Sequence, residues 1–233
     1  MGQCLFCQNE IREVLTLQEL FGFGKKNRGR VCRSCEEKLP RLAGQTVCPG
    51  CMRPQASSVD LCEDCRRWRS CYPELTIAHH ACYAYTGIVK DWLQHYKFQG
   101  DYRLAGAFTN DLQALQRTHP QALFLPLPIS IASYEERGFN QCEELLKQAG
   151  IRCVQFLGNQ HAGEKQSEKN RQERLLTMQP FLLLEGYEKY LQQEIILFDD
   201  VYTTGRTLYH AKILCTSMGS EWSVQLRLQD NKS

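Results

Sequence analysis

The sequence lacks the features that direct a chain into or across a membrane. Its longest apolar run, about residues 122–129, is interrupted by two prolines. That run falls far short of the ~18 apolar residues that a membrane-spanning helix needs. The first residues contain neither a basic segment nor a long apolar one, so no signal peptide is expected. We therefore predict a cytoplasmic protein.

The sequence also lacks a strong charge of either sign. Its 28 Lys and Arg residues nearly balance its 26 Asp and Glu residues, and the formal net charge is +2. Net charge therefore gives no support for nucleic-acid binding. Two local basic clusters, residues 25–30 and 66–69, are the exceptions. The first could contact phosphates or be a solvated loop. The second contains Trp68, which could stack on single-stranded bases or pack at a domain junction.

Several nucleotide-binding and metal-binding patterns are missing. Neither the Gly-Lys-Ser/Thr phosphate loop nor the Gly-x-Gly-x-x-Gly dinucleotide fingerprint occurs. The six histidines form no spaced cluster.

Cysteine, in contrast, is abundant and unevenly distributed. Of the 13 cysteines, ten lie within residues 1–82, and a reducing cytosol argues against disulfides. Eight form four Cys-x-x-Cys pairs, a spacing that aims two thiolates at one ion. Eight ligands suffice for two closed, structural Zn²⁺ sites. The predicted ligands are Cys4, Cys7, Cys32, Cys35, Cys48, Cys51, Cys62 and Cys65.

The spacing leaves the pairing of these four motifs open. Sequential pairing would join the first motif with the second and the third with the fourth, whereas crossed pairing would join the first with the third. A redox role needs a single Cys-x-x-Cys in a thioredoxin-like setting, which four pairs do not resemble. We predict a zinc-binding module over residues 1–75 and a second domain over residues 76–233.

The second domain alternates predicted strands and helices. Strand-like segments are expected at 76–85, 122–126, 194–198 and 222–228. Helical spacing of apolar residues is found at 88–96, 104–115, 143–148 and 207–218. Residues 159–172 are polar and without periodicity, which predicts a loop. This alternation is typical of an α/β domain with a largely parallel sheet.

Residues 195–207 are the most informative segment. Four apolar residues predict a buried strand, and two acids follow at its carboxyl end, where open α/β sheets bind their ligands. Thr-Thr-Gly then leads into a helix, so hydroxyl and backbone N–H groups form an anion cradle. Glycine permits a close backbone approach. An acid pair beside a phosphate cradle suits a sugar phosphate.

This segment resembles the signature with which type I phosphoribosyltransferases bind 5-phosphoribosyl 1-pyrophosphate (PRPP). The resemblance implies a parallel sheet with helices on both faces. It also implies that Asp199 and Asp200 contact the ribose hydroxyls. The residues implied to hold the 5′-phosphate are Val201, Tyr202, Thr203, Thr204, Gly205, Arg206 and Thr207.

Nearly the whole chain resembles the ComF family of late competence proteins from Gram-positive bacteria. The likeness rests on the four cysteine pairs, on the PRPP signature, and on the segments Tyr-Lys-Phe-Gln-Gly-Asp (96–101), Pro-Leu-Pro (126–128) and Arg-Gly-Phe-Asn-Gln (137–141). It implies a role in DNA uptake during natural transformation, with a ComFA-type helicase-like ATPase and single-stranded DNA as partners.

The resemblance also implies residues for the pyrophosphate. Leu127 and Pro128 lie in the loop after the first core strand, which would hold this group. Lys165 and Arg174, in and beside a predicted flexible loop at 158–173, and Arg137 are candidate cations. Mg²⁺ would bind mainly through PRPP oxygens. The chain could then be a competence factor that uses the pocket as a sensor, or an active phosphoribosyltransferase, which performs a pentosyl transfer, with an unidentified acceptor.

Overall fold

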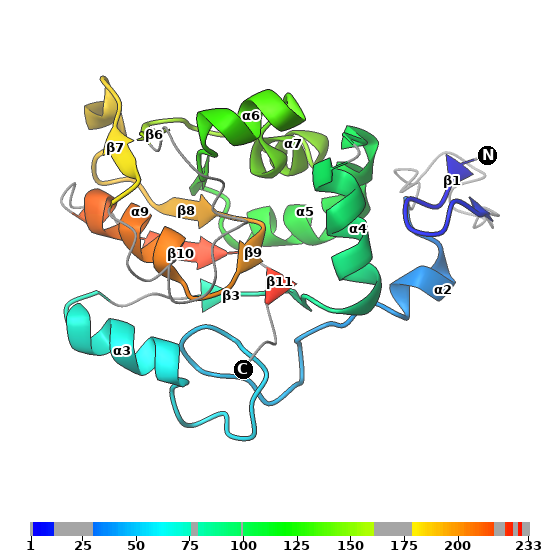
Figure 1. The fold of residues 1–233 in the computed structure, drawn as a ribbon, viewed down its shortest axis with the longest axis horizontal. Coiled ribbons are helices and arrows are strands. Elements are labelled where there is room, and N and C mark those ends of the chain that lie inside the picture. The colour runs from blue at the N-terminus through cyan, green and yellow to red at the C-terminus, as the bar shows by residue number, and fades with distance from the viewer. Residues whose placement is uncertain are drawn as a thin grey trace.

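A computed structural model describes residues 2–11, 30–75, 79–98, 100–160, 179–216, 222–225 and 228–229. Figure 1 shows an α/β body with the N-terminal segment at one side and a second cysteine-containing segment below the strands. Among the described helices, none is both long enough and apolar enough to cross a bilayer.

Four parallel strands form the central sheet. Their order is β3 (His79–His80), β10 (Trp222–Gln225), β8 (Ile195–Phe198) and β5 (Leu123–Pro126). The register pairs Ile195 with both Leu123 and Trp222. All four residues of β8 are buried, as a run of apolar residues in a parallel strand requires. The predicted α/β class with a largely parallel sheet is therefore confirmed.

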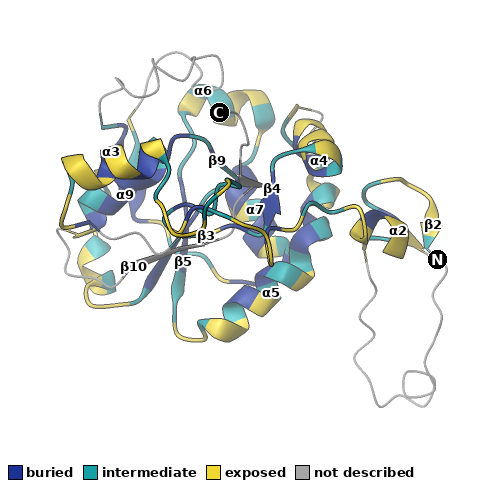
Figure 2. Cartoon of the chain, turned by 90° about the horizontal axis from the view of Figure 1, so that it is seen from below, coloured by how far each residue is buried: buried dark blue, intermediate teal, exposed yellow. Residues whose placement is uncertain are grey.

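Alternating residues of β8 face two separate cores. Ile196 and Phe198 pack with α4 (Gly87–Phe98), the 3-10 helix η1 (Tyr102–Phe108), α5 (Thr109–Thr118) and α7 (Gln141–Gln148). Ile195 and Leu197 pack with α9 (Arg206–Thr216). Because successive residues of a strand point to opposite faces, helices cover the sheet on both sides (Figure 2).

Two smaller sheets border the central one. Three parallel strands, β4 (Tyr83–Ala84), β11 (Leu228–Gln229) and β9 (Val201–Tyr202), form the first. The antiparallel pair β6 (Leu157–Asn159) and β7 (Phe181–Leu183) forms the second. The 3-10 helix η3 (Tyr187–Tyr190) follows β7.

Several predicted elements differ from those observed. The strand expected at 76–85 is divided between β3 and β4, and residues 76–78 lie outside the described part. The single helix expected at 104–115 is η1 followed by α5. Helix α6 (Ile131–Arg137) and the β6–β7 pair were not predicted. Helix α6 buries no residue and the two strands have three residues each, so neither leaves a clear hydrophobic pattern.

The two cysteine segments differ in how they meet the α/β body. The first contains β1 (Gly2–Gln3), β2 (Glu10–Ile11) and α2 (Arg33–Glu36), and extends to one side in Figure 2. The second contains α3 (Glu63–Cys71), and Cys48, Cys51 and Cys65 belong to the same buried cluster as Leu208 of α9. The second cysteine segment therefore shares its apolar core with the sheet.

Candidate functional site

The eight predicted ligand cysteines form two clusters. One contains Cys4, Cys7, Cys32 and Cys35, and the other contains Cys48, Cys51, Cys62 and Cys65. Within each cluster the four Sγ atoms lie within 4.8 Å of one another. The structure thus selects the sequential pairing from the two that the spacing had left open.

Each cluster has the donor set and the dimensions of a zinc site. The Sγ atoms of Cys51 and Cys62 are 3.6 Å apart, and those of Cys7 and Cys32 are 3.7 Å apart. Thiolates at about 2.3 Å around a tetrahedral Zn²⁺ would be about 3.8 Å from each other. Both clusters could therefore hold zinc.

The same backbone turn brings together the two cysteines of the first motif in each cluster. In each, the residue after the second cysteine, Gln8 or Met52, has a positive φ near 60°. Its N–H donates to the carbonyl oxygen of Cys4 or Cys48 at 2.8 Å. Sulfur also accepts backbone N–H groups, for example from Cys62 to Cys48 Sγ at 3.2 Å.

Backbone N–H donors of this kind lower the pKa of the Cys4 thiol. Burial acts to raise its pKa, but the backbone N–H groups of Cys32, Cys7 and Phe6 lower the pKa to about 7. A thiol that ionises this easily is suited to binding a metal as thiolate.

The predicted sugar-phosphate segment lies at the carboxyl ends of the parallel strands. Asp199 and Asp200 directly follow β8, and the next residues form β9. Thr203, Thr204 and Gly205 form the turn that leads into α9. The acids, the turn and the N-terminus of α9 thus lie together, as the sequence predicted.

Glycine is required at position 205. Its φ is +81°, a conformation that other residues adopt only with strain. A Cβ atom there would lie 2.8 Å from Cζ of Tyr202 and nearer still to its hydroxyl oxygen. Because Tyr202 is buried, it cannot easily move aside.

The acid pair is held by local and distant contacts. Asp199 Oδ1 accepts the N–H of Asp200 at 2.9 Å, and Asp200 Oδ1 accepts the N–H of Val201 at 2.6 Å. Asp200 Oδ2 lies 2.5 Å from Nζ of Lys97, at the end of α4. Burial acts to raise the pKa of the Asp200 carboxyl, but Lys97, the Val201 N–H and the charge of Arg137 together lower that pKa below its ordinary value of 3.8.

Arg137 lies beside this site at the end of α6. Its Nη1 donates to Gln141 Oε1 at 3.0 Å, and its guanidinium lies 5.9 Å from the ring centroid of Phe98. Its Nε is buried and has no acceptor among the residues that the structure describes. An oxygen of a bound anion could accept that proton.

The loop after β5 lies next to the acid pair. The N–H of Leu127 donates to the carbonyl oxygen of Phe198 at 2.9 Å, which aligns the loop with the end of β8. Its own carbonyls are taken by side-chain amides: Asn140 donates to Leu127 at 3.0 Å and Asn159 to Pro128 at 3.1 Å. Asn140 also caps α7 by accepting the N–H of Cys142 at 2.9 Å.

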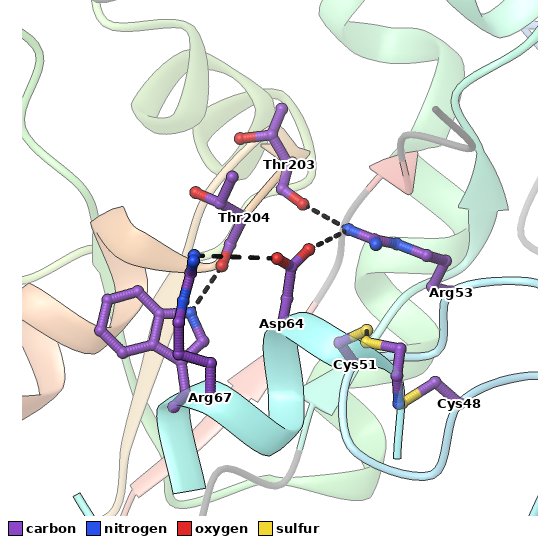
Figure 3. Close-up of polar contacts among 9 residues, drawn as sticks. Cys48, Cys51, Arg53, Asp64, Arg67, Thr203 and Thr204 are labelled. Atoms are coloured by element: carbon purple, nitrogen blue, oxygen red, sulfur yellow. Dashed lines mark hydrogen bonds and ion pairs between the residues drawn. The ribbon is translucent and has the colours of Figure 1, made fainter. Parts of the chain in front are cut away.

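The second cysteine segment contacts the turn before α9 (Figure 3). Arg53 Nη2 donates to the carbonyl oxygen of Thr203 at 2.7 Å and to Asp64 Oδ2 at 2.8 Å. Trp68 Nε1 donates to the carbonyl oxygen of Thr204 at 2.7 Å. Trp68 is buried and stacks on Tyr209. Of the two roles considered for Trp68, packing is therefore correct and base stacking is not.

Not every predicted site residue can be placed. Lys165 and Arg174 lie outside the described residues, as does most of the basic cluster at 25–30. Sequence reasoning had assigned no role to Lys97, Asn140, Asn159 or Arg53. Lys97 and Asn140 do lie inside the segments 96–101 and 137–141, and the family resemblance of those segments was the one signal that could have identified them.

Comparison with known proteins finds relatives that align with nearly the whole chain. No protein-family model matches the chain. The chain is 32% identical to competence protein ComFC of Streptococcus pneumoniae (strain ATCC BAA-255 / R6) over 219 residues, covering 94% of this chain and 96% of that protein. It is 34% identical to competence protein ComFC of Bacillus subtilis (strain 168) over 229 residues, covering 95% of this chain and 91% of that protein.

Two solved structures are also similar. One is a hypoxanthine phosphoribosyltransferase from Staphylococcus aureus, with a TM-score of 0.34 and 12% identity, covering 59% of this chain and 71% of that one. The other is an adenine phosphoribosyltransferase from Saccharomyces cerevisiae, with a TM-score of 0.34 and 14% identity, covering 56% of this chain and 72% of that one.

Proposed function

Since the chain belongs to the ComFC family of competence proteins, we propose that it serves DNA uptake in natural transformation and does so by binding PRPP. The observation that carries the proposal is the meeting of Asp199 and Asp200 with the turn before α9 and with the loop after β5. An acid pair binds hydroxyls, and a helix N-terminus binds phosphate. PRPP contains both groups.

In this proposal each part of the site binds one part of PRPP. Asp199 and Asp200 accept the ribose hydroxyls. The 5′-phosphate lies at residues 201–207, against threonine hydroxyls and the first N–H groups of α9. Arg206, in the first turn, has a buried Nε without an acceptor in the described part of the chain, which supports an anion there.

The pyrophosphate would lie between the loop after β5 and Arg137. Side-chain amides already occupy the carbonyls of Leu127 and Pro128, which reduces repulsion of an anion. The charge and the unused Nε of Arg137 would stabilise it further. Lys165 and Arg174 remain proposed cations of a loop that closes over this group. Mg²⁺ would bind through pyrophosphate and ribose oxygens, and neutralise part of their charge.

The cysteine clusters are proposed to hold two structural zinc ions. All four ligand positions of each ion would be occupied by sulfur, so no position would be left for water or substrate. The protein would act in the cytoplasm, with single-stranded DNA and a ComFA-type ATPase as its partners.

Calorimetric titration with PRPP and Mg²⁺ tests the proposed site. We expect a dissociation constant on the order of micromolar, within the usual range for metabolite sites. Asp199→Asn should abolish measurable binding while leaving the Lys97–Asp200 ion pair intact. Arg33→Gln, in the exposed α2, is the control and should bind normally. Absence of binding by the folded wild-type protein would refute the proposal.

Transfer of the phosphoribosyl group is a second candidate function, favoured by the position of Arg137 beside the acids. The bond from the anomeric carbon to pyrophosphate would break as an acceptor nucleophile bonds to that carbon and loses its proton. Catalysis would come from positioning and charge stabilisation. Pyrophosphate release that Asp199→Asn abolishes would support transfer. Binding of single-stranded DNA or the ATPase that survives this change would support a separate competence role.

A further inference from the structure

We infer that Arg53 and Trp68, both in the second cysteine segment, are positioning residues that set the affinity of the turn before α9 for phosphate. The inference rests on the proposed function, because it assigns a determinant of affinity to the same site. It also links the Cys48–Cys65 cluster, and not the Cys4–Cys35 cluster, to ligand binding.

The two side chains hold two consecutive peptide groups. Arg53 donates to the carbonyl oxygen of Thr203, and Trp68 donates to the carbonyl oxygen of Thr204, each at 2.7 Å. In a trans peptide the N–H points opposite to the C=O. The N–H groups of Thr204 and Gly205 are therefore turned away from the cysteine segment. Successive N–H groups presented in this way bind anions.

Both positioning residues are themselves tightly held. The Arg53 side chain pairs with the buried Asp64. The backbone carbonyl oxygen of Arg53 accepts the N–H of Cys48 at 2.8 Å. Trp68 stacks on Tyr209 with ring centroids 4.5 Å apart and an interplanar angle of 13°. The turn before α9 is thus held by Arg53 and Trp68, and the positions of these two side chains depend on the fold around Cys48.

Arg53 and Trp68 both lie close in sequence to ligands of the second cysteine cluster. Arg53 follows Cys51 by two positions, and Trp68 follows Cys65 by three, on the helix that Cys62 begins. Metal bound by these cysteines would fix both the turn that carries Arg53 and the start of α3. The first cluster meets the α/β body elsewhere, for example where Phe6 packs edge-on against Phe108.

A matched pair of tryptophan variants tests the inference. Trp68→Phe keeps an aromatic ring on Tyr209 but removes the N–H that reaches Thr204. Trp92→Phe removes an equivalent bond, from Trp92 Nε1 to the carbonyl oxygen of Leu104 at 3.0 Å, away from the turn. We expect the PRPP dissociation constant to rise about threefold to tenfold in the first variant and to stay unchanged in the second.

A matched pair of arginine variants provides an independent test. Arg53→Gln removes the bonds to Thr203 and Asp64. Arg41→Gln removes a similar pairing with Asp111, at 3.0 Å. We expect weaker PRPP binding in the Arg53 variant alone, with two zinc ions retained in both. Wild-type affinity in Trp68→Phe and Arg53→Gln, with the zinc retained, would overturn the inference.

Hydrogen exchange separates this inference from the proposed function. In the ligand-free protein, amides of residues 203–209 should exchange about threefold to tenfold faster in Trp68→Phe than in wild type, while those of α4 should not change. This expectation holds even if the wild type fails to bind PRPP, which would refute only the proposed function. Unchanged exchange at residues 203–209 would refute the positioning role.

Discussion

The ammonium nitrogen of Lys97 lies 2.5 Å from a carboxylate oxygen of Asp200, although the two residues come from distant parts of the chain. Both side chains are largely buried, so the ion pair offsets the cost of removing the Asp200 carboxylate from water. The contact joins the 96–101 segment to the acid pair. It therefore gives this segment a role at the site that its sequence alone did not reveal.

Lys97→Met should destabilise the protein by about 3–5 kcal/mol, because it leaves a buried carboxylate without its cation. The double variant Lys97→Met/Asp200→Asn removes both charges and should recover much of that loss. Urea unfolding of the two single variants and the double variant measures the coupling. Additive losses would show that the two groups do not interact.

The same pair predicts an acid dependence of stability. The folded protein lowers the pKa of Asp200 below 3.8, so its contribution is present above about pH 4 and is lost as pH falls through the lower, folded pKa. In Lys97→Met, burial should raise this pKa, and folding would then take up a proton. As pH falls from about 7 to about 4.5, the free energy of unfolding of that variant should therefore rise relative to that of wild type. Urea unfolding at several pH values measures this change.

Gly205→Ala should weaken both the fold and PRPP binding. A positive φ costs a residue with a Cβ atom about 1–2 kcal/mol, and the clash with Tyr202 adds to this. Gly150→Ala is the control, since Gly150 has φ +75° and open space around its missing Cβ. Gly150→Ala should lower the free energy of unfolding only by the cost of the positive φ, and it should leave the affinity for PRPP unchanged. Equal effects of the two changes on binding would contradict the argument.

Asn140 variants separate two functions of one side chain. Asn140→Ser should retain the cap of α7, since serine is a good N-cap, but lose the bond to the Leu127 carbonyl. Asn140→Ala should lose both, at an additional cost of about 1 kcal/mol. Both variants should bind inorganic pyrophosphate less well than wild type. Normal binding by Asn140→Ser would mean that Asn140 does not position the loop.

The two cysteine clusters should differ in their effect on stability. We expect two zinc ions per chain, and loss of about one in either Cys7→Ser or Cys62→Ser. The Cys62 change should lower the thermal midpoint more, because its cluster is packed against the sheet core. Metal analysis and thermal unfolding of both variants provide the check. One zinc in the wild-type protein would contradict the eight-ligand interpretation.

The sequence predicted those features that depend on local patterns. The apolar run of β8, the acids that follow it and the turn into α9 are contiguous, so their order determined their placement. Cysteine spacing identified the eight clustered thiols for the same reason. Helix α4 was found because its buried residues recur at helical spacing.

Features that depend on tertiary contacts could not be predicted. Whether the cysteine motifs pair sequentially depends on the path of the chain between them. The bond from Arg53 to Thr203 joins residues 150 positions apart, so it depends on how the second cysteine segment meets the turn before α9. Trp68 sits among cations in the sequence, which left base stacking and packing at a domain junction both open. Its stack on Tyr209 decides for packing.

The position of β10 affects how the protein assembles during translation. This strand lies between β3 and β8 but comes from residues 222–225, after both of its neighbours in the chain. On the ribosome, the central sheet cannot join β3 to β8 until those residues emerge. The cysteine clusters need only residues 4–35 and 48–65, so they can close on the nascent chain. We expect metal loading to precede completion of the ligand site.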